Sequence, residues 1–224
     1  MSSIANNIAE VRARIARAAL SAGRDPKDIT LVAVSKTVDT ERIREAWEAG
    51  ITDFGENYYQ EVRTKMQELP RQIRWHFIGH LQTNKAKYIA GRFALVQSVD
   101  REELAEELGR RANAAGCTQP VLVEVKLDPA ATKHGVPPDQ TIDFCNRVRA
   151  IPGLQLTGLM GMAPLLQHPE QARPYFAELR RIFERLPEEN RRVLSMGMSA
   201  DFDVAIQEGS TMVRVGTAIF GARQ

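Results

Sequence analysis

The chain has 224 residues, and its hydrophobic content of 43% is enough for one sizeable core. Its 30 lysine and arginine residues stand against 28 acidic residues, so the net charge of +2 argues against nucleic acid or an anionic membrane as a partner. The sequence has no apolar run of membrane-spanning length and no signal-peptide core at its N-terminus. The two cysteines, Cys117 and Cys145, form no CxxC motif and indicate structural thiols in a reducing compartment. We therefore expect a soluble, cytoplasmic protein, and a monomer.

Helices and strands are predicted to alternate along the first half of the chain. The first segment has apolar residues at helical spacing and should form an amphipathic helix that ends near residue 23: Ile4, Ile8, Val11 and Ile15. Apolar runs then predict strands at residues 31–36, 51–55, 73–79 and 93–98. The helices between them should end near residue 50, before residue 70 and at residue 90. Asp39 or Thr40 is expected to cap the first of these, and Glu56-Asn57 to open the second.

The same alternation continues to the end of the chain. Residues 100–103 resemble a capping box, with Asp100 in place of serine or threonine, and should start another helix. Four more strands are predicted, at residues 121–127, 154–160, 193–195 and 211–215. Helices should follow Pro138, end at Pro187 and cover residues 200–207.

Eight strand–helix units without a linker predict that residues 1–224 form one (β/α)8 barrel domain, with an extra helix at its N-terminus. An open, doubly wound sheet is the alternative fold. That fold would favour a glycine-rich turn after the first strand, and Ser35-Lys36-Thr37 contains no glycine.

Lys36 stands at the carboxyl end of the first predicted strand. Side chains alternate along a strand, so Val32, Val34 and Lys36 should share one face. Dry surroundings would penalise the ammonium form of this lysine and make its amine a nucleophile that can form an imine. The alternative is a lysine whose head group simply reaches solvent at the strand end.

Polar and glycine residues gather at the carboxyl ends of the predicted strands, where a barrel carries its active site. The loops after strands seven and eight, residues 197–199 and 216–218, occupy the positions where barrels often bind phosphate. Gly197 and Gly216 allow close approach of an anion to the backbone, and the hydroxyls of Ser199 and Thr217 can donate hydrogen bonds. A purely structural alternative makes Ser199 a helix cap and Gly216 a turn residue.

Arg214 should point into the barrel if Val213 and Val215 pack against the outer helices. A buried arginine needs an acceptor, which a ring nitrogen of a bound cofactor or a carboxylate such as Glu124 could provide. His76 and His80 lie on a strand and its loop and are not expected to converge on a metal. The sequence has no P-loop, GxGxxG or GxSxG motif.

Several longer stretches together resemble a known family. They are Ala33-Val34-Ser35-Lys36-Thr37, Phe54-Gly55-Glu56-Asn57-Tyr58, the run 75–85, Gly158-Leu159-Met160, Ser195-Met196-Gly197-Met198-Ser199 and the run 209–221. This pattern resembles the pyridoxal phosphate homeostasis proteins, the YggS/PROSC family, and covers nearly the whole chain. The family is similar in fold to the barrel domain of bacterial alanine racemase, fold type III among pyridoxal phosphate proteins.

The resemblance implies that the chain binds pyridoxal 5′-phosphate (PLP). Lys36 would hold it as an internal aldimine, Ser199 with the backbone amides of Gly216 and Thr217 would bind its phosphate, and Arg214 would face its pyridine nitrogen. Asn57 and His80 would lie near the ring, and Met198 is a further expected cofactor-binding residue. The chain departs from the family in the loop after strand five, where Ala131-Thr132-Lys133-His134-Gly135 replaces a Ser-Lys-x-Gly pattern and leaves the role of Thr132 open.

The residues favour a carrier of PLP over an enzyme. An arginine at the pyridine nitrogen would keep it unprotonated and make the ring a poor electron sink. The predicted barrel uses the whole chain, so we expect no second domain to supply an opposing acid or base. We therefore expect storage, buffering or delivery of PLP, with apo-enzymes as possible recipients and Lys133 as a possible aid to transfer. A PLP-dependent racemase or lyase, and a Schiff-base aldolase without a cofactor, are the alternatives.

Overall fold

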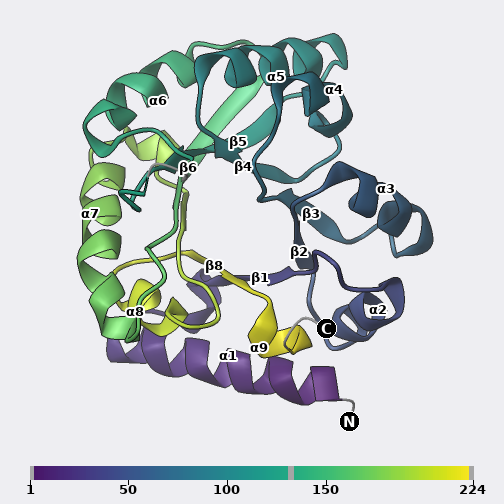
Figure 1. Cartoon of the computed structure of the whole chain (residues 1–224), viewed down its shortest axis with the longest axis vertical. Helices are drawn as coiled ribbons and strands as arrows, with labels where there is room; N and C mark the ends of the chain where they lie inside the picture. The colour runs from purple at the N-terminus through teal and green to yellow at the C-terminus, as the bar shows by residue number, and fades with distance from the viewer. Residues whose placement is uncertain (1–2, 131–133, 222–224) are drawn as a thin grey trace.

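The computed structural model of the chain describes residues 3–130 and 134–221. Eight parallel strands follow one another around a closed barrel, in which the last strand pairs with the first (Figure 1). The strands are β1 (Thr30–Val34), β2 (Asp53–Glu56), β3 (Arg74–Phe77), β4 (Leu95–Val99), β5 (Gln119–Val125), β6 (Leu154–Gly161), β7 (Val193–Ser195) and β8 (Met212–Val215). This closed order confirms the predicted (β/α)8 barrel and excludes the open sheet.

Helices form a ring outside the strands (Figure 1). They are α1 (Ser3–Ser21), α2 (Thr40–Glu48), α3 (Tyr59–Glu68), α4 (Ala86–Ile89), α5 (Glu102–Ala114), α6 (Thr141–Arg149), α7 (Arg173–Phe183), α8 (Phe202–Gln207) and α9 (Thr217–Phe220). The predicted extra helix is α1, which precedes the first strand and packs against α2, α8 and α9. Its predicted apolar stripe is buried, because that face closes the outer wall of the barrel.

Three of the predicted helix starts differ from the structure. Glu56 belongs to β2, and α3 begins only at Tyr59. The expected capping box at Asp100 is wrong: Arg101 is the N-cap of α5 without a side-chain capping bond, because the Asp100 carboxylate accepts a hydrogen bond from the Arg101 guanidinium at 2.6 Å instead. The helix expected over 200–207 begins at Phe202.

Other local predictions are confirmed or refined. Asp39 caps α2, since its carboxylate accepts from the backbone amide of Arg42 at 2.9 Å. The helix expected over 81–90 is shorter, and consists of a 3-10 turn, Thr83–Lys85, followed by α4.

Alternation along the strands divides the core into two layers. One face of the strands packs against the helices in a large apolar layer that includes Ala33, Val213 and Val215. The opposite face points into the barrel, where a small apolar cluster fills part of the interior: Val32, Leu95, Leu122, Met160 and Met212. Polar side chains fill other parts of the interior, among them His76, Gln97, Ser195 and Arg214, which are joined by hydrogen bonds.

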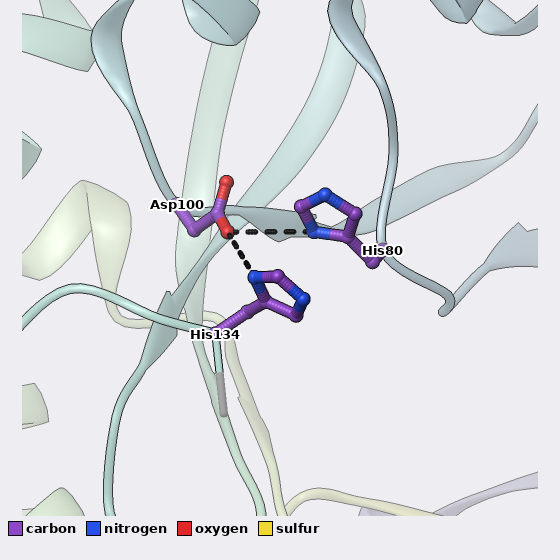
Figure 2. A group of neighbouring side chains, drawn as sticks. All are labelled: His80, Asp100 and His134. Atoms are coloured by element: carbon purple, nitrogen blue, oxygen red, sulfur yellow. Dashed lines mark ion pairs between the residues drawn. The ribbon is translucent and has the colours of Figure 1, made fainter. Parts of the chain in front are cut away.

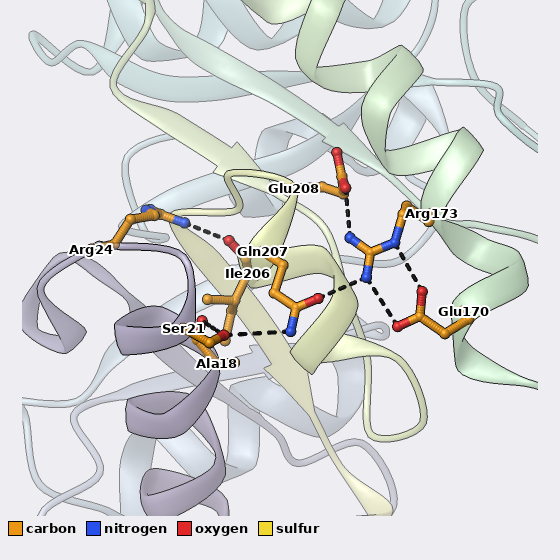
Figure 3. Close-up of polar contacts among 8 residues, drawn as sticks. All are labelled: Ala18, Ser21, Arg24, Glu170, Arg173, Ile206, Gln207 and Glu208. Carbon is orange, nitrogen blue, oxygen red and sulfur yellow. Dashed lines mark hydrogen bonds and ion pairs between the residues drawn. The ribbon is translucent and has the colours of Figure 1, made fainter.

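Arg173 at the start of α7 ties together three parts of the outer wall (Figure 3). Its guanidinium donates to Glu170 at 2.8 Å, and to Gln207 and Glu208 at 2.7 Å each. The side-chain amide of Gln207 reaches Ser21 at the end of α1 at 3.5 Å. These contacts fix α1 and α7 to the end of α8, the helix that follows one of the two predicted phosphate loops.

Two observations bear on the predictions from composition. In the described part of the chain, no helix combines the length and the apolar character needed to cross a bilayer. Cys117 and Cys145 are free thiols, and burial raises the pKa of Cys145 to about 12, against the opposing effect of Arg149. Cys145 is therefore a protonated core residue.

Candidate functional site

Two hollows lie at the carboxyl ends of the strands, and Val34 and Lys36 line both of them. The first has a volume of about 550 Å³ and lies between the loops that follow β1 and β8, with Gly216 and Thr217 in its wall. The second has a volume of about 610 Å³, and its lining includes four other predicted site residues and the carboxylate of Glu124: Asn57, His80, Met198 and Arg214. Lys36 therefore stands at the boundary between the two hollows.

The backbone around Lys36 is held by a buried polar cluster. The ammonium of Lys65 donates to the carbonyl oxygen of Ser35 and to the Glu56 carboxylate, at 2.8 Å each. The Ser35 hydroxyl donates to the same carboxylate oxygen at 2.6 Å. Thr37, on the other side of Lys36, has a φ of +63°, a strained conformation for a β-branched residue. The half-buried Lys36 thus sits in a turn whose two flanks are fixed.

Ser199 joins the loops that follow β7 and β8. Its hydroxyl oxygen accepts hydrogen bonds from the backbone amides of Gly216 at 3.3 Å and Ala218 at 3.4 Å. It is not the helix cap of the structural alternative, because α8 is capped at Asp201, whose carboxylate accepts from the Met198 amide at 2.7 Å. The hydroxyl of Ser199 is therefore held by the backbone amides on either side of Thr217.

Gly197 allows this loop to form. Its φ is +94°, a region that side chains rarely tolerate, and a Cβ atom there would lie 2.6 Å from the Cβ of Ala205. Only glycine lets the chain leave β7 so close to α8, and this turn brings Ser199 to the β8 loop.

Arg214 lies inside the barrel, as the alternation of β8 predicts. Its guanidinium donates to the Ser195 hydroxyl at 2.6 Å and to the Gly161 carbonyl at 3.1 Å, so these two atoms, rather than Glu124, are its hydrogen-bond acceptors. Burial lowers the pKa of Arg214 to about 10, although the charges of Glu124 and Asp201 oppose this shift. Arg214 therefore remains protonated at neutral pH and presents a fixed positive charge to the larger hollow.

Glu124 is the buried carboxylate of that hollow. Burial and the nearby charge of Asp100 raise its pKa to about 7, against the opposing effect of Arg214. The sequence had indicated Glu124 only as a partner for Arg214. In the structure, its raised pKa lets Glu124 gain or lose a proton near neutral pH.

Asn57 follows β2 and lines the larger hollow. Its side-chain oxygen is buried and has no hydrogen-bond partner among the described residues. Gly79 lies directly against the backbone of Asn57, since a Cβ atom at Gly79 would come within 2.6 Å of the Asn57 backbone carbonyl oxygen. The site thus holds a buried acceptor that a ligand with a hydroxyl or N–H group can satisfy.

His80 lies at the rim beside two residues that were not predicted as site residues, Asp100 and His134 (Figure 2). The two imidazole rings stack with centroids 3.7 Å apart. Burial and the nearby charge of His134 lower the pKa of His80, while Asp100 opposes the shift. Asp100 directly follows β4, and that position at the end of a strand was the signal that could have identified it. His76, in contrast, is buried in the barrel and bonds to Asp53 and Gln97. Thr132 and Lys133 lie outside the described residues.

Comparison with known proteins places the chain in a family. The family model described as "Alanine racemase, N-terminal domain" matches residues 1–224. The pyridoxal phosphate homeostasis protein of Pseudomonas aeruginosa is 44% identical over 224 residues, covering 100% of this chain and 97% of the relative. The protein of the same name from Aquifex aeolicus is 42% identical over 221 residues, covering 97% of each chain.

A solved structure resembles the chain over the same length. The structure of PipY from Synechococcus elongatus with PLP bound is 35% identical, covers 98% of this chain and 100% of its own, and superposes with a TM-score of 0.84. Together with the barrel and the motifs at its rim, these similarities show that the chain belongs to the family of pyridoxal phosphate homeostasis proteins, built on the alanine racemase N-terminal domain.

Proposed function

We propose that the chain binds PLP at the mouth of the barrel and serves to store, buffer or deliver it inside the cell. The observation that carries this proposal is the position of Lys36, between a hollow lined by Gly216 and Thr217 and a hollow lined by Arg214. The PLP-bound structure of PipY and the names of the relatives support the choice of cofactor. The proposal treats residues 1–224 as one domain that acts as a monomer.

The donors of the site fit this cofactor. The amine of Lys36 matches the aldehyde, and the buried guanidinium of Arg214 matches the ring nitrogen. The hydroxyl of Ser199 and the backbone amides around it match the phosphate. The buried oxygen of Asn57, which has no partner among the described residues, can accept a hydrogen bond from a polar group on the ring. Lys36, Ser199, Arg214 and Asn57 therefore each have a chemical counterpart on PLP.

When bound, PLP supplies an electrophilic carbon that reacts with amines. Lys36 would provide the amine that holds it covalently. Ser199, with the backbone amides of Gly216 and Thr217 in the wall of the first hollow, would bind the phosphate and fix its position. Arg214, which is held by Ser195 and Gly161, would lie at the ring nitrogen and disfavour a second positive charge there. Met198 and His80 line the larger hollow and would lie beside the ring.

We infer that the chain is a carrier rather than a racemase or lyase. A racemase needs a stabilised carbanion and an acid or base on each face of the substrate, and the charge of Arg214 opposes the first requirement. Met198, with 37% of its surface exposed, leaves the larger hollow accessible, which suits the exchange of cofactor with apo-enzymes.

Covalent trapping tests the binding site. The purified protein should be coloured, and borohydride reduction followed by peptide mapping should place the pyridoxyl group on Lys36. Lys36→Ala should abolish this adduct, whereas Lys85→Ala, which removes another lysine of the family motifs, should keep it. A main adduct at Lys85 or Lys133 would refute the assignment, and a colourless protein would favour the aldolase without a cofactor.

Turnover and transfer test the carrier role. Holo-protein incubated with L- or D-alanine should not racemise either one at an enzymatic rate of about 1 per second or faster. It should restore activity to an apo-aminotransferase. Fast racemisation would overturn the carrier role, and unchanged transfer by Lys133→Ala would remove only the proposed contribution of Lys133.

A further inference from the structure

His80, Asp100 and His134 bring three metal-ligating atoms together at the rim of the barrel. The residues come from three separate segments, the loops that follow β3, β4 and β5. The Nδ1 atoms of His80 and His134 lie 3.7 Å and 4.0 Å from the same oxygen of Asp100, Oδ2 (Figure 2). All three ligand atoms lie within 4.8 Å of one another. These distances exceed hydrogen-bond length, so the three groups converge and leave a gap between them.

The size of this gap suits a small cation. A tetrahedral zinc ion, with bonds of 2.0–2.2 Å to nitrogen and oxygen, holds its ligand atoms roughly 3.3 Å apart. From separations of up to 4.8 Å, the ligand atoms need to close by as much as about 1.5 Å, and the stacked imidazoles need to rotate out of their parallel arrangement, for one ion to be coordinated. The imidazole side chains of His80 and His134 are 38% and 54% exposed, so the gap is open to solvent. The Asp100 side chain is only 7% exposed and is the buried, fixed member of the group.

The carboxylate of Asp100 is oriented from behind. Its other oxygen, Oδ1, accepts a hydrogen bond from Arg101 at 2.6 Å, and Arg101 also donates to the carbonyl oxygen of Leu81 at 2.6 Å. Arg101 thus couples Asp100 to the segment next to His80 and leaves Oδ2 directed at the two imidazoles. Outer contacts of this kind orient the ligands in known metal sites.

We propose that His80, Asp100 and His134 form a binding site for one divalent transition-metal ion of the zinc class. Two imidazoles and one carboxylate are a donor set that favours zinc and its neighbours over magnesium or calcium. Three protein ligands leave a fourth position for water or for an oxygen of a small molecule. Because both histidines line the hollow that also contains Lys36, the ion lies at the entrance to that hollow.

Metal titration of the untagged, full-length protein tests this site. After dialysis against a chelator, equilibrium dialysis with zinc should give one ion per chain, with a dissociation constant of about 1 μM or tighter. Cobalt(II) should show the visible absorption of a four-coordinate site. His134→Ala and Asp100→Asn should each weaken zinc binding about a hundredfold or more, because loss of even an outer contact costs 10–100-fold.

His168→Ala is the matched control, since His168 is an exposed histidine that lines the same hollow but lies outside the cluster. It should leave zinc binding unchanged, and circular dichroism should show that all variants are folded. The site would be refuted if zinc bound more weakly than about 1 mM, if His134→Ala bound it as well as the parent, or if His168→Ala lost as much. Because the quantity measured is bound zinc rather than retained PLP, these results do not depend on the proposed binding of PLP.

Discussion

Arg214 and Asp53 are connected across the interior of the barrel by four hydrogen bonds that all run in one direction. The guanidinium of Arg214 donates to Ser195 at 2.6 Å, and the Ser195 hydroxyl donates to the side-chain oxygen of Gln97 at 2.7 Å. The Gln97 amide donates to Nδ1 of His76 at 3.1 Å, and Nε2 of His76 donates to Asp53 at 2.8 Å. This series of hydrogen bonds connects a cation to an anion through residues of β8, β7, β4, β3 and β2.

The donor and acceptor roles in this series are fixed by the two charged residues at its ends, Arg214 and Asp53. Since Arg214 can only donate, Ser195 must donate onward to Gln97, whose amide nitrogen is then left for His76. Burial alone would raise the pKa of Asp53, but hydrogen bonds from His76 and Thr52 outweigh it and hold the pKa below its ordinary value. Arg214 is therefore oriented by a network that extends far from the candidate site.

Removal of the Ser195 hydroxyl should destabilise the protein. Ser195→Ala leaves the buried Arg214 and Gln97 each without one partner, and should lower the free energy of unfolding by about 1–3 kcal/mol in urea denaturation. Ser98→Ala is the control, because Ser98 is equally buried but its hydroxyl has no partner among the described residues. Ser98→Ala removes a buried hydroxyl that makes no hydrogen bond, so it should not lower the free energy of unfolding. Equal losses in both variants would contradict a special role for the network.

Replacement of Lys65 should loosen the turn that carries Lys36. Lys65 and Glu56 form a buried ion pair with atoms 2.8 Å apart, so Lys65→Met leaves an unpaired buried carboxylate and should cost about 3–5 kcal/mol of unfolding free energy. Arg180→Met, which breaks the exposed pair with Glu184, should cost at most about 1 kcal/mol. The yield of borohydride-trapped adduct at Lys36 should fall only in Lys65→Met, and similar results for the two variants would speak against this role of the cluster.

Glu124 should make stability depend on pH near neutrality. Burial and the charge of Asp100 raise its pKa from 4.5 to about 7, although the charge of Arg214 opposes this shift. The folded state therefore keeps a proton that the unfolded chain releases. Its contribution to stability is therefore complete below about pH 4.5 and is lost as pH rises through about 7.

Glu124→Gln should remove this dependence. Relative to the parent, the variant should gain on the order of 3 kcal/mol of unfolding free energy between pH 5 and pH 8, measured in urea without cofactor or metal. Glu106→Gln, at an exposed position, should follow the parent at both pH values. A parallel course for Glu124→Gln and the parent would show that Glu124 is ionised throughout this range.

Ser199→Ala should weaken the retention of PLP. A hydrogen bond to a charged group contributes about 1.5–3 kcal/mol, so loss of the Ser199 hydroxyl should raise the dissociation constant by about tenfold to a hundredfold. Ser199→Thr keeps the hydroxyl and should retain most of the affinity. Pyridoxal, which lacks the phosphate, should bind poorly to the parent, and its dissociation constant should be the same for Ser199→Ala, as measured by absorbance titration. Equal affinity of the parent for pyridoxal and its phosphate would place the phosphate site elsewhere.

The periodicity of the sequence determined the barrel fold and which face of a strand each side chain occupies. Alternating strands and helices predicted eight units in order, and the alternation within β1 and β8 predicted which faces Val32 and Arg214 occupy. Such patterns are local, because a strand side chain and its neighbours along the chain must divide between two faces. The same local reasoning failed at Asp100, where the capping-box pattern was outweighed by the charge of the adjacent Arg101.

Contacts between distant strands were decided only by the tertiary structure. The partners of Ser199 lie on another loop, the chain from Arg214 to Asp53 crosses five strands, and His134 meets Asp100 across the rim. Each contact depends on the register of neighbouring strands and on closure of the barrel, which pairs Val32 of the first strand with Arg214 of the last. No local pattern encodes such pairs, because the side chains that meet are selected by the geometry of the closed sheet.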